Sequence, residues 1–189
     1  DYTHPEFDGE LLQGYDFVDE DADATTTHPH GIYVAGILAA LGENAFGVSG
    51  IARCRILPIR VVGPGIFGTT FDLAQGIDFA VSRGVDIINM SLQGYPASSV
   101  VLKTALQAGA DKEIVMIGAA GNLGIGTADP NWPAASAFVM SVGATTRFDP
   151  RADFSATGSV LDFVAPGLEV VTVANSSSDD MKSFSGTSA

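Results

Sequence analysis

Three short stretches of the sequence carry residues that could perform acyl-transfer chemistry. Ser188 closes a Gly-Thr-Ser turn, His30 is followed by a glycine, and Asn122 closes an Ala-Ala-Gly-Asn stretch. A serine attacks a carbonyl carbon efficiently only when a base such as histidine removes its proton. The oxyanion that then forms needs hydrogen-bond donors, which an Asn side chain and backbone N–H groups can supply. The stretches therefore offer a base, an oxyanion donor and a nucleophile.

Each stretch alone also has a simpler structural explanation. Ser and Thr beside Gly most often form turns or helix caps, and a single His is most often a surface or core residue. Residues 118–124 suggest a dinucleotide-binding loop, but their Gly-x-x-Gly-x-x-Gly spacing differs from the dinucleotide fingerprint. Residues 126–130 read as a loop, whereas phosphate binding favours a helix N-terminus. A nucleotide-binding α/β domain is therefore the third-ranked hypothesis.

The composition describes an acidic globular chain. Of its 189 residues, 46% are hydrophobic and 16% are charged, which suits one domain with a sizeable core. A formal net charge of −13 argues against binding to nucleic acid or to an anionic membrane surface. No apolar run is long enough to span a bilayer. Cys54 has no second cysteine to pair with, and we expect a structural or surface thiol.

Helical periodicity alternates with short apolar runs along most of the chain. We predict helices beginning near His30, at Thr69 or Thr70, and at Ser98 or Ser99. Gly42 and Gly84 are expected to end the first two helices, and Gly31 and Gly36 to mark close packing of the first. Buried strands are predicted at residues 55–62, 85–90 and 113–119, and further strands at 137–144 and 160–164.

The alternation of these elements predicts a single domain with a parallel sheet and right-handed crossovers. Residues 1–29 are acidic and irregular, and we expect a surface loop there. In parallel α/β sheets, sites form beyond the carboxyl ends of the strands. Residues 91–94 and 119–122 each follow a predicted strand, so we expect both stretches at the same edge of the sheet.

In combination, these motifs resemble the subtilisin-like serine peptidases from one end of the chain to the other. The resemblance implies an α/β fold of three layers, with a central, mostly parallel sheet flanked by helices. The matching stretches are His30–Gly36, Asn89–Leu92, Ala119–Asn122, Trp132–Ala135, Ser141–Ala144, Phe154–Ser155, Asp162–Gly167 and Gly186–Ser188.

The resemblance implies a role for each matched position. His30 corresponds to the general base, Ser188 to the nucleophile and Asn122 to the side-chain oxyanion donor. The strand that pairs with the substrate backbone corresponds to Ser91, Leu92, Gln93 and Gly94, and the opposite wall to Ile66, Phe67 and Gly68. The floor of the pocket before the scissile bond corresponds to Ala119, Ala120 and Gly121.

The sequence departs from the family pattern in three places. Ile32-Tyr33 stands where the family has Thr-His, and Gln93 stands where the family has a glycine. The family's catalytic Asp corresponds to a position about four residues upstream of this sequence, and its long buried helix after the serine to residues downstream. We therefore expect residues 1–189 to be a peptidase domain truncated at both ends, and this stretch alone to be inactive.

The resulting prediction is a secreted serine endopeptidase that hydrolyses peptide bonds in polypeptide substrates through an acyl-enzyme on Ser188. The full-length protein is expected to carry a pro-segment. The alternative is a non-catalytic, peptide-binding relative of the same fold. The resemblance also implies a structural calcium ion, with ligands at Glu6, Asn44, Phe46 and Val48.

Overall fold

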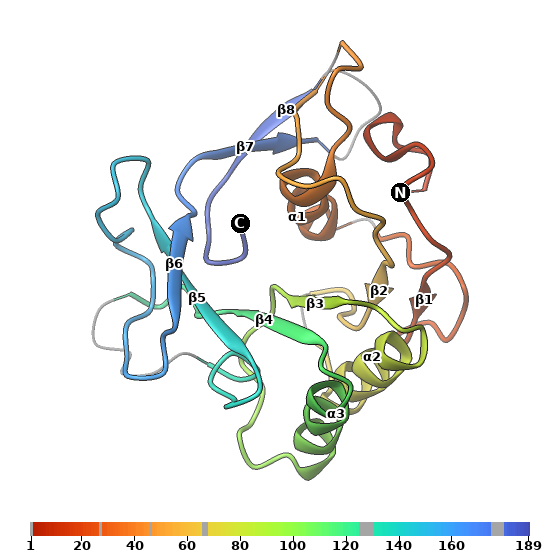
Figure 1. Cartoon of the computed structure of the whole chain (residues 1–189), viewed down its shortest axis with the longest axis vertical. Helices are drawn as coiled ribbons and strands as arrows, with labels where there is room; N and C mark the ends of the chain where they lie inside the picture. The colour runs from red at the N-terminus through yellow and green to blue at the C-terminus, as the bar shows by residue number, and fades with distance from the viewer. Residues whose placement is uncertain (1, 27, 46, 66–67, 125–130, 175–179) are drawn as a thin grey trace. The chain divides into compact units, whose positions relative to one another are not determined.

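The computed structural model describes every residue except 1, 27, 46, 66–67, 125–130 and 175–179. The described residues form two compact units, the first from residues 1–68 and 169–184 and the second from residues 69–168 and 185–189 (Figure 1). None of the described helices is long and apolar enough to cross a bilayer. The prediction that residues 1–189 form one domain stays a prediction.

The first unit contains the helix that begins at His30. Its elements are η1 (Pro5–Phe7), β1 (Tyr15–Asp16), α1 (His30–Ala39), β2 (Ile59–Arg60), β7 (Val170–Val173) and β8 (Met181–Phe184). Strand β1 pairs in parallel with β2, and β7 pairs antiparallel with β8. Helix α1 packs on β7, where Phe7, Ile32, Ala40 and Val173 form a buried apolar cluster.

The packing of α1 explains one of its two glycines. A Cβ on Gly36 would lie 2.5 Å from Thr172 Oγ1 and 2.8 Å from Val173 Cγ2, so only glycine lets β7 approach this closely. The expected close packing is thus confirmed at Gly36, but it is wrong at Gly31, where a Cβ would meet nothing within 4 Å. Gly42 does not end the helix either, because α1 stops at Ala39.

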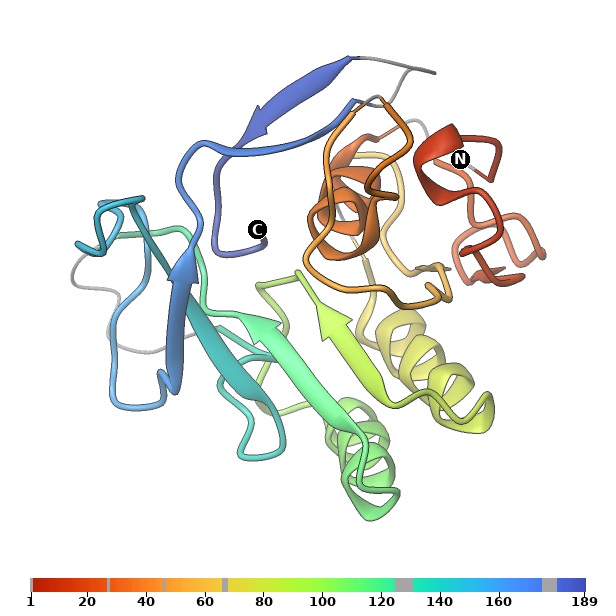
Figure 2. The ribbon, with the colours of Figure 1, turned by 45° about the horizontal axis from the view of Figure 1, so that its top comes forward.

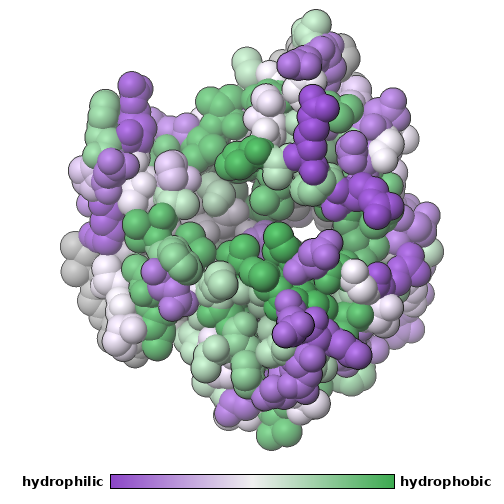
Figure 3. Space-filling view, viewed as in Figure 1, coloured by the Kyte–Doolittle hydropathy of each residue, from purple (hydrophilic) through white to green (hydrophobic). Residues whose placement is uncertain are grey.

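The second unit contains the parallel sheet. Its elements are α2 (Thr70–Ser82), β3 (Ile87–Met90), α3 (Val100–Asp111), β4 (Val115–Ala119), β5 (Met140–Thr145) and β6 (Phe163–Pro166). The four strands pair in the order β3-β4-β5-β6, all in parallel, which confirms the predicted sheet. Helices α2 and α3 pack together on one side of β3 and β4 (Figure 2). Hydrophilic side chains gather on the surface over these helices (Figure 3).

Local sequence signals set the ends of α2 and α3. Thr69 forms a capping box with Asp72, since each side chain accepts a hydrogen bond from the other's backbone N–H. Ser99 caps α3 by accepting from Leu102 N at 3.3 Å. Gly84 follows α2 with a φ of +66°, the left-handed conformation that glycine favours after a helix. These caps and this helix end were correctly predicted.

The predicted strands are in the right places but are shorter and less buried than expected. The run at residues 55–62 contributes only the two half-buried residues of β2. In β3, Ile87 is exposed and Met90 is buried, because one face of the sheet is packed and the other is open among the described residues. The sequence patterns did not indicate β1, β7 or β8.

Candidate functional site

The Asn122 side chain is held by the residue that precedes the candidate nucleophile. Asn122 Oδ1 accepts hydrogen bonds from Thr187 N at 2.9 Å and from Thr187 Oγ1 at 3.0 Å. The Thr187 hydroxyl in turn accepts from Gly121 N at 3.0 Å. Because two donors fix the amide oxygen, the Nδ2 group of Asn122 is directed away from Thr187 and can serve as a donor.

Ser188 is anchored to the segment that follows β3. Ser91 Oγ donates to the Ser188 carbonyl at 3.0 Å, and Ser188 Oγ donates to the Ser91 carbonyl at 3.5 Å. A Cβ on Gly186 would lie 3.5 Å from Asn122 Nδ2 and 3.6 Å from Ser188 N. Two N–H donors therefore border the same small space next to Gly186. Such a pair of donors beside a serine hydroxyl suits the stabilisation of a developing oxyanion.

His30 is the first residue of α1 and lies in the first unit, whereas Ser188 and Asn122 lie in the second. Its ring contacts Phe184 edge-on, with ring centroids 5.6 Å apart and planes at 81°. Burial lowers the pKa of His30 below its ordinary value, and the nearby charge of His28 lowers it further. At neutral pH the imidazole is therefore uncharged and able to accept a proton.

Ile32 and Tyr33, which stand where the family has Thr-His, have packing roles within the first unit. Ile32 is buried in the apolar cluster with Phe7 and Val173. The Tyr33 ring lies 5.7 Å from the Phe184 ring, and the Tyr33 carbonyl accepts from Thr172 Oγ1 at 2.7 Å. The Ile-Tyr pair therefore packs α1 against β7 and β8 and leaves His30 at the start of the helix.

The two predicted substrate-binding stretches of the second unit lie at one edge of the sheet. Strands β3 and β4 are parallel and in register, with Met90 opposite Gly118, so residues 91–94 and 119–122 emerge side by side. This confirms the expected placement. Ala119 and Ala120 are buried, Gly121 has a φ of +112°, and Leu92 is half-buried. Of the opposite wall, Gly68 lies in the first unit, while Ile66 and Phe67 lie outside the described residues.

The environment of Glu6 fits a hard cation. The Glu6 side chain is fully buried, with Oε2 accepting from Asn44 Nδ2 at 3.2 Å and Oε1 having no hydrogen-bond partner among the described residues. A Cβ on Gly47 would lie only 1.6 Å from Glu6 Oε1, so the loop backbone closes tightly over the carboxylate. A buried carboxylate oxygen needs a compensating partner, and calcium binds oxygen ligands of this kind.

The remaining predicted calcium ligands are close to one another in the sequence. Asn44 and Val48 are half-buried, and Phe46 lies outside the described residues. Among the described residues, no group of three His, Cys, Asp or Glu side chains could hold a metal ion. Any ion at Glu6 would therefore take most of its ligands from backbone carbonyl and amide oxygens.

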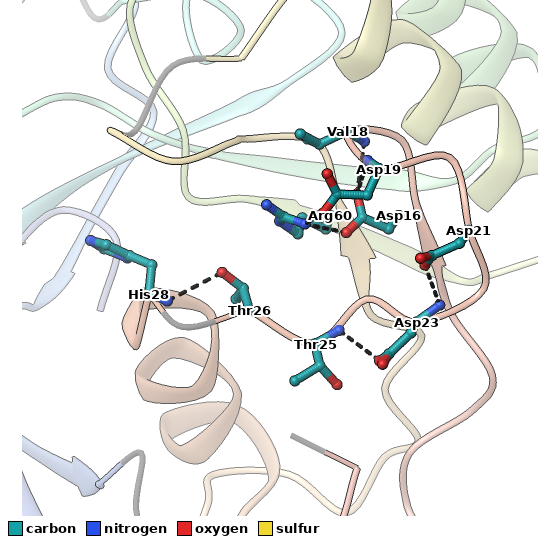
Figure 4. Close-up of polar contacts among 9 residues, drawn as sticks. All are labelled: Asp16, Val18, Asp19, Asp21, Asp23, Thr25, Thr26, His28 and Arg60. Carbon is teal, nitrogen blue, oxygen red and sulfur yellow. Dashed lines mark hydrogen bonds and ion pairs between the residues drawn. The ribbon is translucent and has the colours of Figure 1, made fainter.

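An ion pair between β1 and β2 was missed by the sequence analysis. Asp16 is 1% exposed, accepts from Val18 N at 2.7 Å and Asp19 N at 3.0 Å, and forms an ion pair with Arg60 (Figure 4). Asp19 also pairs with Arg60. The expectation of a surface loop over residues 1–29 is thus wrong at Asp16, and also at His4 and Glu6, which are buried. The only sequence signal was an Asp between two aromatic residues.

The single cysteine was expected to be either a structural or a surface thiol. Cys54 is an exposed free thiol. It is therefore a surface thiol.

Comparisons with known proteins place the chain in a family. The sequence model of the subtilase family matches residues 1–189. The chain is 41% identical to a thermophilic serine proteinase of Bacillus sp. (strain AK1) over 91% of its length, and 37% identical to thermitase of Thermoactinomyces vulgaris over 98%. It spans 42% and 65% of the lengths of these two relatives.

Two solved structures share the fold. A cold-adapted subtilisin-like serine proteinase has a TM-score of 0.85 and 33% identity, over 98% of this chain and 65% of its own. The prenylagaramide maturation protease PagA has a TM-score of 0.83 and 28% identity, over the whole of this chain and 66% of its own. With the same α/β fold and a family match along its full length, the chain belongs to the subtilase family of serine peptidases.

Proposed function

We propose that this chain carries the nucleophile, base and oxyanion donor of a serine endopeptidase. The observation that supports this most is the network in which Thr187 fixes the amide oxygen of Asn122 and leaves its Nδ2 group available beside Ser188. Binding a peptide requires no such arrangement, whereas stabilising an oxyanion does. The names of the relatives agree with this proposal, since they are serine proteinases.

The proposed reaction proceeds in two acyl-transfer steps. Ser188 Oγ attacks the carbonyl carbon of the scissile peptide bond while His30 takes its proton, and the oxyanion is bound by Asn122 Nδ2 and Ser188 N. His30 then gives the proton to the leaving amine as the C–N bond breaks, which leaves an ester on Ser188. A water molecule, deprotonated by His30, hydrolyses this ester. A carboxylate upstream of residue 1 is proposed to orient His30.

The proposed substrate is a polypeptide in an extended conformation. Residues Ser91–Gly94 continue from β3 and would pair with its backbone, with Ile66, Phe67 and Gly68 as the opposite wall. Ala119, Ala120 and Gly121 would line the floor of the pocket before the scissile bond. Main-chain hydrogen bonds of this kind bind many sequences, and the pockets for side chains set the preference.

The full-length protein is proposed to be secreted, to carry a pro-segment and to contain a further helix after Ser188. The open face of the β3–β6 sheet supports the last point. Ile87, Val115, Met140 and Phe163 are exposed on neighbouring strands, and the register places Ile87 beside Val115. An apolar row of this kind is stabilised when another element covers it.

A structural calcium ion at Glu6, Asn44, Phe46 and Val48 is also proposed. Bound calcium would compensate the buried Glu6 carboxylate and hold the loop against it. We expect a chelator to lower the Tm of the full-length protein, and to change the Tm of a Glu6→Gln variant far less. A wild-type Tm that is indifferent to chelator would contradict the site.

The test of the proposed function is covalent labelling of the full-length protein with a fluorophosphonate, followed by peptide mapping. We expect a single adduct on Ser188 that a Ser188→Ala variant lacks. A peptide-binding relative without catalysis would bind peptides but stay unlabelled, and that result would refute the proposal.

A further inference from the structure

The side chain of Gln93 joins the two segments that flank Ser188. Gln93 lies two residues beyond Ser91, and its Oε1 accepts a hydrogen bond from Asn122 N at 3.3 Å. The same oxygen would lie 2.9 Å from a Cβ on Gly121. The Gln93 side chain therefore crosses from the segment after β3 to the segment after β4.

The space that Gln93 crosses is where the acyl residue of the substrate must place its side chain. This step rests on the proposed function. During acylation the carbonyl carbon is bonded to Ser188 Oγ, and its oxygen points to Asn122 Nδ2 and Ser188 N. Ser188 Oγ is within 3.5 Å of the Ser91 carbonyl. The side chain on the adjacent α-carbon then extends between residues 91–93 and 119–121.

The described residues that border this space present polar groups to Gly121. Asn131 Nδ2 would also lie 2.9 Å from a Cβ on Gly121, so two carboxamide groups converge on this glycine. Ala119 and Ala120 beneath it are buried and small. An aromatic side chain entering beside Gly121 would have to displace the Gln93 carboxamide and break its bond to Asn122 N.

We propose that Gln93 closes off the primary specificity pocket and makes this enzyme prefer a small residue, such as Gly, Ala or Ser, on the acyl side of the scissile bond. Gln93 is thus a specificity-determining residue. It contacts the backbone of Asn122, so its removal should change the choice of substrate.

The experiment compares kcat/KM of the full-length protein on peptide anilides that differ only in the acyl residue: Gly, Ala, Leu or Phe. We expect the wild type to prefer the Ala substrate over the Phe substrate. A Gln93→Ala variant should raise kcat/KM for the Phe substrate by at least about tenfold relative to that for the Ala substrate. The matched control is Gln107→Ala, which removes an exposed Gln on α3 and should leave the ranking unchanged.

The possible outcomes distinguish a failure of the proposed role of Gln93 from a failure of the proposed function. A wild type that cleaves the Phe substrate as well as the Ala substrate would overturn the role of Gln93, because the side chain then moves aside freely. An unchanged Ala-to-Phe ratio of kcat/KM in a folded Gln93→Ala variant would also overturn the role of Gln93. If that variant does not fold, the wild-type ranking of the substrates still tests the role. Failure to cleave any substrate, together with no fluorophosphonate labelling, would refute the proposed function itself.

Discussion

The two units hold their proposed catalytic groups by different kinds of interaction. In the second unit, hydrogen bonds through Thr187 and Ser91 fix the amide of Asn122 and the carbonyl and hydroxyl groups of Ser188. In the first unit, the His30 ring is held by its position at the start of α1 and by its edge-on contact with Phe184. The donor is positioned by polar partners, and the base by packing.

The difference matches what each group is proposed to do. An oxyanion donor must keep one orientation, and hydrogen bonds to its other end secure that orientation. A general base must stay uncharged before the reaction, and an apolar neighbour disfavours its charged form. Substitutions that remove hydrogen bonds in the second unit should therefore lower mainly kcat. Substitutions that disturb packing in the first unit should lower mainly the free energy of unfolding.

The largest expected effect is at Asn122. We expect Asn122→Ala in the full-length protein to lower kcat and to change KM little, because the donor acts on the transition-state oxyanion. The expected size is taken over from the loss measured for the corresponding donor in subtilisin, about 10²–10³ in kcat. A loss confined to KM would show that Asn122 only binds substrate.

Packing in the first unit is tested by a pair of glycines on α1. Gly36→Ala should destabilise the protein by about 1–3 kcal/mol, because its Cβ would overlap Thr172 and Val173 of β7. Gly31→Ala is the control, since its Cβ would meet nothing within 4 Å, and it should stabilise by about 0.5–1 kcal/mol. Urea unfolding measures both. Equal effects of the two substitutions would show that α1 does not depend on close approach to β7.

A smaller effect is expected at Thr187, which orients Asn122 without touching the substrate. Thr187→Val removes the hydroxyl that donates to Asn122 Oδ1 and accepts from Gly121 N. We expect kcat to fall by about tenfold, the value of one hydrogen bond, with KM nearly unchanged. Thr187→Ser keeps the hydroxyl and should restore most of the activity. If Ser does not rescue, the loss comes from packing and not from orientation.

The smallest expected effect is on the pH profile. The charge of His28 lowers the pKa of His30, so removing it in His28→Gln should raise that pKa. More of His30 is then protonated at acidic pH, and the acid limb of kcat/KM should move to higher pH. His28→Lys keeps a positive charge and should not show this shift. A shift of the same sign in both variants would exclude an electrostatic cause.

Much of the second unit could be predicted from local sequence patterns. Its parallel sheet, the caps at Thr69 and Ser99 and the helix end at Gly84 depend on residues close together in the chain. The same holds for the shared edge of residues 91–94 and 119–122, because parallel pairing follows from alternating strands and helices.

The features that escaped prediction depend on partners far apart in the sequence. Asp16 is buried because Arg60, 44 residues later, pairs with it. Gln93 reaches the backbone of Asn122 across 29 positions. No local pattern marks such contacts. The sequence could show that Gln93 departs from the family pattern, but not where its side chain lies.

The central proposal is that His30 and Ser188 act together in catalysis, and an affinity label tests it most directly. A peptidyl chloromethyl ketone with Ala as its acyl residue adds Ser188 Oγ to its ketone and alkylates the imidazole through its chloromethyl carbon, with loss of chloride. We predict that mass mapping of the full-length protein finds the label on His30, and that Ser188→Ala reduces this labelling sharply. Labelling of His28 instead, or labelling of His30 that does not depend on Ser188, would contradict the account.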